Sequence, residues 1–196
     1  MTDQGPKDDL LRYLRAGRDA LLWKLEGLGE YDIRRPLTPT GTNLLGLVKH
    51  CAGVEAGYFG HVFGRPFPEP LPWMEDGADD NADMWAAPEE TRADITALYG
   101  RVAAHADATV VALPLDAEGE VPWWRPESRR VTLHRILVHV TAETHRHAGH
   151  ADIVRELVDG AAGMTKGNDN LPSGGEDWWH GYRDRVEDAA RRAAGS

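Results

Sequence analysis

The stretch of residues 131–158 reads VTLHRILVHVTAETHRHAGHADIVRELV. Apolar residues recur in it at intervals of three and four, which is the period of one face of an α-helix. They are Leu133, Ile136, Leu137, Val140, Ile153, Val154 and Leu157. The stretch therefore predicts a long amphipathic helix that buries one side against other elements.

Three further stretches show the same periodicity, at about residues 7–28, at about residues 42–62, and from just after Pro88 to about Leu113. We expect Thr42 to cap the second of these helices, because a hydroxyl can accept a hydrogen bond from a free backbone N–H at a helix start. In the third, Glu89 and Glu90 would place negative charge in the first turn, where the helix dipole favours it.

Long connections separate the predicted helices. A Pro-rich crossover covers residues 65–87, a second loop covers residues 114–130, and a Gly-rich linker after Gly160 leads to a short tail helix at about residues 175–190. No stretch of useful length alternates as a strand does. We therefore expect an all-α fold, a four-helix bundle with one long crossover and an extra C-terminal helix, forming a single domain over residues 1–196.

The overall composition narrows the class of protein. The 196 residues carry a formal net charge of −10, which disfavours nucleic acid and anionic membranes as partners. The single cysteine, Cys51, excludes an internal disulfide framework and a Cys-rich zinc site. No apolar run is long enough to span a membrane, and the first nine residues are polar, unlike a signal peptide. These features favour a cytoplasmic protein.

A candidate metal site lies in the residue 131–158 stretch. Glu143 and His147 are four residues apart, so they lie on one face of the predicted helix. They could occupy two positions around a metal, and a third ligand from another helix would leave a fourth position open for water or a substrate sulfur. His139 and His150 share that face, and His50 in the second predicted helix is a candidate third ligand. The alternative is a set of solvated or hydrogen-bonded histidines.

Other residues with reactive or recognition chemistry have structural explanations as well. Cys51 lies in the apolar stripe of the second predicted helix, so we expect it to pack rather than react. Trp123 and Trp124 in the second loop are candidates for the wall of a pocket, or for lid and core packing. The nearby arginines would either bind an anionic substrate or form a solvated basic patch. They are Arg125, Arg129 and Arg130.

Two segments resemble the DinB-like superfamily. The run TNLLGLVKH at residues 42–50, with the Val-Glu and Tyr-Phe pairs that follow it, is similar to the second helix of that family, and ETHRHAGHAD at residues 143–152 is similar to its fourth-helix motif. The resemblance covers about residues 7–190. It implies an up-down-down-up four-helix bundle, a homodimer, and a divalent metal, zinc or else nickel. Many members bind the metal with three histidines. Glu143 departs from that pattern but is similar to the mycothiol-dependent maleylpyruvate isomerase branch, so the implied ligands are His50, Glu143 and His147.

The resemblance implies a metal-dependent thiol S-transferase or isomerase that uses mycothiol and an electrophilic small molecule. A divalent cation lowers the pKa of a bound thiol, so the cofactor itself supplies the nucleophilic sulfur. Two alternatives remain open from the residues alone. One is a hydrolase in which metal-bound water is the nucleophile. The other is a metal-binding dimeric bundle without catalytic activity, acting in stress response or as an interaction module.

Overall fold

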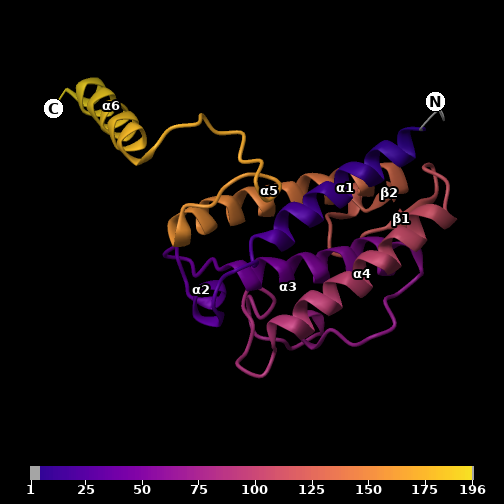
Figure 1. Cartoon of the computed structure of the whole chain (residues 1–196). Coiled ribbons are helices and arrows are strands. Elements are labelled where there is room, and N and C mark those ends of the chain that lie inside the picture. The colour runs from indigo at the N-terminus through magenta and orange to yellow at the C-terminus, as the bar shows by residue number, and fades with distance from the viewer. Residues whose placement is uncertain (1–4, 196) are drawn as a thin grey trace.

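The computed structural model describes residues 5–195, and its dominant elements are four long helices. They are α1 (Pro6–Trp23), α3 (Leu44–Glu55), α4 (Arg92–Ala112) and α5 (Leu133–Asp159). As Figure 1 shows, α1 runs along α5, while α3 packs against both α4 and α5. The chain is therefore mostly helical, as predicted. Residues 1–4 and 196, the outermost parts of the expected 1–196 domain, lie outside the described residues.

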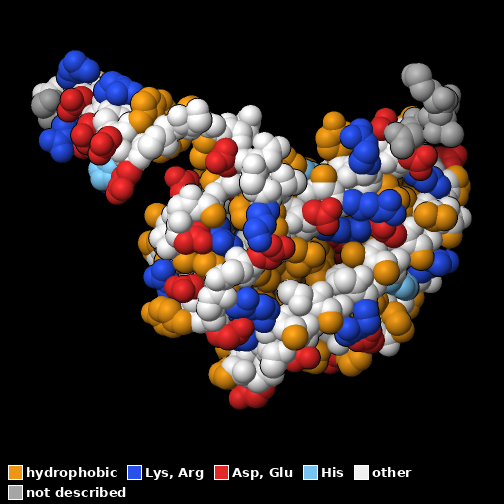
Figure 2. Space-filling model, viewed as in Figure 1, with side chains coloured by type: hydrophobic (Ala, Val, Ile, Leu, Met, Phe, Trp, Pro, Cys, Tyr) orange, Lys and Arg blue, Asp and Glu red, His pale blue; other side chains and the backbone are white. Residues whose placement is uncertain are grey.

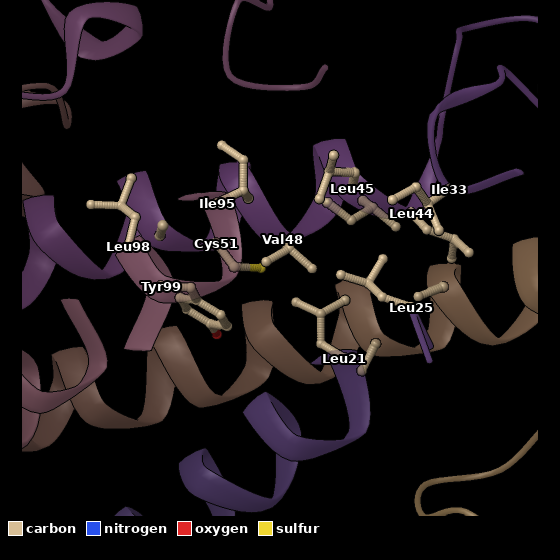
Figure 3. Close-up of a cluster of buried hydrophobic side chains, with 14 of the residues drawn as sticks. Leu21, Leu25, Ile33, Leu44, Leu45, Val48, Cys51, Ile95, Leu98 and Tyr99 are labelled. Atoms are coloured by element: carbon tan, nitrogen blue, oxygen red, sulfur yellow. The ribbon is translucent and has the colours of Figure 1, made fainter. Parts of the chain in front are cut away.

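The apolar core forms two clusters along these helices. One cluster contains Leu21 of α1, Val48 of α3 and Ile95 of α4, and Figure 3 shows their side chains together. The other contains Leu14 of α1 and Ile136 of α5. All five side chains are at most 2% exposed, so truncating any of them to alanine is expected to cost about 1–5 kcal/mol of stability. The core fixes how α3 and α5 face each other, and that in turn positions the candidate site.

The start of α3 differs from the prediction by one residue. The expected cap at Thr42 is wrong, because Asn43 is the capping residue and its side-chain oxygen accepts a hydrogen bond from the Gly46 N–H at 2.8 Å. Asparagine and threonine both cap helices well, so neighbouring candidates are hard to rank from sequence.

The start of α4 also lies later than expected. The predicted start just after Pro88, with Glu89 and Glu90 in the first turn, is wrong. Thr91 caps the helix and exchanges hydrogen bonds with Asp94 in a capping box. Glu90 instead accepts a hydrogen bond from the ammonium group of Lys49 on α3. Its carboxylate therefore stabilises a contact between two elements rather than the first turn of α4.

The first two predicted helices are shorter than their apolar patterns suggest. The helix expected over residues 7–28 ends at Trp23, and the chain then turns through Gly27, whose φ of 76° suits only glycine well. A short helix that we did not predict, α2 (Glu30–Arg34), follows. The helix expected over residues 42–62 is regular only to Glu55, and continues as a π-helical turn, Ala56–Gly60, and a 3₁₀ turn, His61–Phe63.

A small antiparallel sheet lies between α4 and α5. It pairs β1 (Glu118–Glu120) with β2 (Arg130–Thr132), in a register that places Gly119 opposite Val131. These short strands were not predicted, and the chain remains mostly helical. Strands of three residues are too short for an alternating pattern to emerge. The sheet anchors the loop between them at the start of α5.

The tail helix α6 (Glu176–Ala194) projects away from the other helices (Figure 1). Side chains of both charge signs cover it in Figure 2, and no residue of α6 is buried. A single domain over residues 1–196 therefore stays a prediction. No helix of the described chain combines the length and apolar character that crossing a membrane requires.

Candidate functional site

The packing of α3 on α5 brings His50 and His147 together. Their ring centroids are 4.7 Å apart, with the ring planes at 70°. His147 is buried, and His50 is partly buried. The two histidines are almost a hundred positions apart in the chain, so their contact depends entirely on the tertiary fold. Two of the three predicted metal ligands are therefore neighbours in space.

Glu143, the third predicted ligand, lies one helical turn before His147. Its Oε2 atom is 3.7 Å from Nε2 of His147. Two donors bound to one tetrahedral zinc at about 2.0–2.2 Å would be roughly 3.4 Å apart, so this separation is close to that of a shared ion. Within residues 5–195, however, no group of three His, Cys, Asp or Glu side chains stands in an arrangement that could hold a metal ion. The structure brings the ligands together in pairs rather than as a closed triad.

Asp83 is a site residue that the sequence did not reveal. It lies in the crossover between α3 and α4, and its Oδ2 atom is 2.6 Å from Nδ1 of His50. An ionised carboxylate can only accept a hydrogen bond, so Nδ1 of His50 carries the proton and donates it to Asp83. In the neutral ring, Nε2 then keeps its free lone pair, as a metal-binding histidine requires.

Two residues on α3 hold the crossover where Asp83 can reach His50. A Cβ atom at Gly46 would lie 1.8 Å from the carbonyl oxygen of Met84, so only glycine allows the crossover backbone to pass this close to α3. The side-chain amide of Asn43 donates to the same carbonyl at 3.0 Å. Gly46 is one turn before His50, and the contact therefore fixes the crossover beside the histidine.

The electrostatics of His147 favour the neutral imidazole. Burial, followed by the charges of His50 and His150, lowers the pKa of His147 from 6.5 to about 4. Its Nδ1 atom is buried and has no hydrogen-bond partner among the described residues. A neutral imidazole is the form that binds metals. A buried ring nitrogen without a protein partner is also costly unless something else binds it. The neutral form fits a metal ligand that binds through Nε2, the nitrogen that faces Glu143, and the unpartnered Nδ1 is left unexplained by that binding mode.

An aromatic cluster surrounds His139, one turn before Glu143. The Tyr58 ring lies 4.9 Å from the His139 ring and 5.3 Å from Trp123, and Trp124 lies 5.0 Å from His139. The indole N–H groups of Trp123 and Trp124 both donate to the Tyr58 hydroxyl, at 3.3 and 2.9 Å. The π-helical turn after α3 carries Tyr58. Burial lowers the pKa of His139, so it is a neutral member of this cluster.

The remaining histidines of α5 are His150, which contacts His147 from the surface, and His145 and His134, which lie elsewhere on the helix. His150 is exposed, although its ring centroid lies 5.4 Å from that of His147. His145 donates from Nε2 to the carbonyl oxygen of Tyr13 on α1 at 2.9 Å. His134 is exposed at the start of the helix. These histidines have the solvated or hydrogen-bonded roles that were the alternative explanation.

Cys51 is buried in the core, as predicted. It lies among Val48, Ile95 and Tyr99 in Figure 3 and is 2% exposed. Burial raises the pKa of its thiol well above the usual value, and the carboxylates of Glu55 and Glu143 raise it further. A thiol that stays protonated and is closed to solvent is a poor nucleophile.

A cavity of about 780 Å³ begins one turn beyond His50 along α3. Its lining comes from α3 and the π-helical turn, from the early crossover, and from the loop after β1. It includes Val54, Gly57, Tyr58, Phe67, Met74 and Trp123. Trp123 therefore does wall a pocket, which was one of its two predicted roles. Trp85 is exposed and is not part of this lining.

The chain is similar to a known protein family over most of its length. The sequence model of the mycothiol-S-transferase family matches residues 9–160, from α1 through the end of α5. The match includes both histidines of the pair, Glu143 and Asp83, and excludes α6. No curated protein matches the chain.

Proposed function

The chain belongs to the mycothiol S-transferase family, and we propose that it is a metal-dependent enzyme that transfers mycothiol to an electrophilic small molecule. The observation that carries the proposal is the contact between His50 and His147, with Glu143 one turn away on the same helix face. These are the three positions at which the family resemblance implies metal ligands.

We assign the metal to Nε2 of His50, the carboxylate of Glu143 and the imidazole of His147. One oxygen and two nitrogen donors suit zinc, with nickel as the second candidate. Three properties support the assignment. Asp83 leaves the His50 lone pair free, burial keeps His147 neutral, and Nε2 of His147 lies 3.7 Å from Oε2 of Glu143. The bound cation would lower the pKa of the mycothiol thiol, so the thiolate is available at neutral pH.

The chain's own residues bind and orient rather than react. Asp83 holds the His50 ring in one tautomer and one orientation. The Tyr58 hydroxyl binds both indole N–H groups and fixes the aromatic wall beside the site. Cys51 contributes packing only, since its thiol is buried and protonated. The nucleophilic sulfur therefore comes from the cofactor.

The proposal extends to the fold and assembly. The contacts of α1, α3, α4 and α5 support the up-down-down-up bundle of the DinB-like superfamily. We further propose a homodimer acting in the cytoplasm, as the resemblance implies.

The test is transfer of mycothiol to 1-chloro-2,4-dinitrobenzene. The thiolate sulfur forms a bond to the ring carbon, the carbon–chlorine bond breaks, chloride leaves, and the thiol proton passes to solvent. We expect zinc-loaded protein to form the thioether faster than free mycothiol does, chelator-treated protein to lose the gain, and added zinc to restore it. Mass spectrometry identifies the adduct. An unchanged rate with and without protein, over a panel of electrophiles, would refute the transferase proposal.

A further inference from the structure

The cavity beyond His50 shares a helix face with the candidate metal ligand. His50 and Val54 are four residues apart on one face of α3, and Gly57 follows in the π-helical turn. The cavity begins at Gly53 and Val54, one turn from His50, and ends beside Trp123. Trp123 in turn contacts Tyr58, whose ring faces His139 on α5. The cavity therefore lies about one helical turn from His50, although none of the three proposed metal ligands is part of its lining.

The lining of the cavity is mainly apolar, and the acidic and basic side chains among its described residues are three carboxylates and one histidine, His61. The apolar part comprises Val54, Ala56, Phe67, Leu71, Met74 and Trp123, and the acidic part comprises Glu69, Glu75 and Asp76. Arg101 binds Glu69 from outside at 2.6 Å, which neutralises one of the three carboxylates. No lysine or arginine lines the cavity among the described residues.

Two glycines line the cavity, Gly53 on α3 and Gly57 in the π-helical turn. A Cβ at Gly53 would lie 2.7 Å from the sulfur of Met74, and a Cβ at Gly57 would lie 3.5 Å from Trp123. Glycine in a helix costs about 1 kcal/mol relative to alanine. Here the missing side chain at Gly53 lets Met74 approach the helix, whereas a Cβ at Gly57 would make only an ordinary contact with Trp123.

The arginines that could bind an anion are placed elsewhere. Arg129 donates from Nε to the carbonyl oxygen of Trp124 at 2.8 Å, which ties it to its own loop. Arg125 and Arg130 are exposed, and none of the three lines the cavity. An anionic ligand would therefore be desolvated beside Glu75 and Asp76 with no lysine or arginine to pair with, which is unfavourable, and only His61 among the described lining residues could offer it a positive charge.

From this lining we propose that the cavity binds the electrophile and selects neutral aromatic or apolar molecules over carboxylates. The inference rests on the proposed function for identifying the ligand as an electrophile. The predicted selectivity between ligands rests on the lining of the cavity alone. An apolar slot with aromatic walls gains affinity from burying apolar area, whereas the acidic rim repels anions.

Binding of two unreactive ligands tests the selectivity without catalysis. The pair is 2,4-dinitrotoluene, which is neutral, and 4-methyl-3-nitrobenzoate, in which a carboxylate replaces one nitro group. Isothermal titration calorimetry on the zinc-loaded protein is expected to give at least about tenfold tighter binding of the neutral member. Equal affinities, or tighter binding of the carboxylate, would overturn the inference.

Matched variants locate the binding site. Trp123 and Trp85 are both 51% exposed, but only Trp123 lines the cavity, so Trp123→Ala is expected to weaken 2,4-dinitrotoluene binding several-fold and Trp85→Ala to leave it unchanged. Met74→Arg adds a cation to the rim and is expected to improve binding of the carboxylate. Equal losses from both tryptophan substitutions would place the ligand elsewhere. Thermal unfolding of each variant reports whether the fold is retained.

Measuring turnover distinguishes a failure of this inference from a failure of the proposed function. Selective binding without mycothiol transfer to 1-chloro-2,4-dinitrobenzene would reject the transferase and leave an apolar-ligand site. Transfer that accelerates 1-chloro-2,4-dinitrobenzene and 4-chloro-3-nitrobenzoate equally, each relative to its uncatalysed rate, would support the transferase and reject the selectivity. We expect the larger acceleration for 1-chloro-2,4-dinitrobenzene, by about the same tenfold factor as in binding.

Discussion

Asp83 holds His50 by a hydrogen bond of 2.6 Å between Oδ2 and Nδ1, across an interval of 33 residues in the chain. The bond links the crossover to α3 and sets the tautomer of a candidate metal ligand. We predict that Asp83→Ala weakens zinc binding about 10–100-fold, the range typical of losing the group that orients a ligating histidine. Titration against a competing chelator measures it. Asp80→Ala, which changes an exposed residue of the same crossover, is the control. Equal losses of zinc affinity in both variants would show that Asp83 has no specific role in orienting His50.

The assignment of ligands on α5 yields a second prediction. Glu143→Ala should weaken zinc binding far more than His150→Ala or His139→Ala, by at least about 10–100-fold. His150 is exposed, and His139 belongs to the aromatic cluster about 12 Å along the helix axis from His147. Chelator competition on the three single variants decides. If Glu143→Ala and His139→Ala lost metal equally, the ligand pair would be His139 with Glu143.

Substitution of Cys51 tests whether the nucleophilic sulfur belongs to the cofactor or to the protein. Because Cys51 is buried and its pKa is raised, Cys51→Ala should keep most of the mycothiol-transfer activity. Removing its sulfur should cost about 1 kcal/mol of stability through the small cavity left behind. Steady-state kinetics and thermal unfolding measure the two effects. Loss of turnover with folding and metal content intact would instead make Cys51 part of the chemistry.

The depressed pKa of His147 predicts how the metal-free protein responds to acid. The folded pKa of about 4 lies below the ordinary 6.5, so the unfolded chain takes up a proton in this window that the folded chain does not. His147 therefore destabilises the fold progressively as the pH falls from 6.5 to about 4, with a slope of at most about 1.4 kcal/mol per pH unit.

Urea unfolding of metal-free protein across this range checks the prediction. His147→Gln should show a shallower loss of stability towards low pH than the unchanged chain. His134→Gln, which alters an exposed histidine on the same helix, should follow the unchanged chain. Identical pH slopes for all three proteins would mean that His147 is not held neutral by burial.

The helical periods predicted the long helices and the pairing of Glu143 with His147, because both depend on spacing within one element. The helix ends were less predictable. Asn43 and Thr42 are adjacent residues that can both cap a helix, although asparagine is the stronger cap, and α1 ends at Trp23, before the left-handed Gly27, inside an apolar pattern. The three-residue strands were too short to leave a periodic signal.

The contacts of the site depend on the tertiary fold, which local patterns do not reveal. His50 was one candidate third ligand from the sequence, and the resemblance selected it, since nothing in its neighbours indicates that α3 faces α5. Asp83 lies in a loop with several other aspartates, and its role follows from the close passage of the Met84 backbone over Gly46. The available signal in the sequence was Gly46, because a glycine on a helix lets a loop backbone pass close to it. It does not identify which loop residue lies opposite.

Metal content tests the central claim most directly. Protein without a histidine tag, purified without chelator, should contain about one divalent ion per chain by elemental analysis, with zinc expected. His147→Ala should contain almost none, while His134→Ala should match the unchanged protein. A full metal content in His147→Ala, or no metal in the unchanged protein even after incubation with zinc, would contradict the assignment of His50, Glu143 and His147 as the metal site.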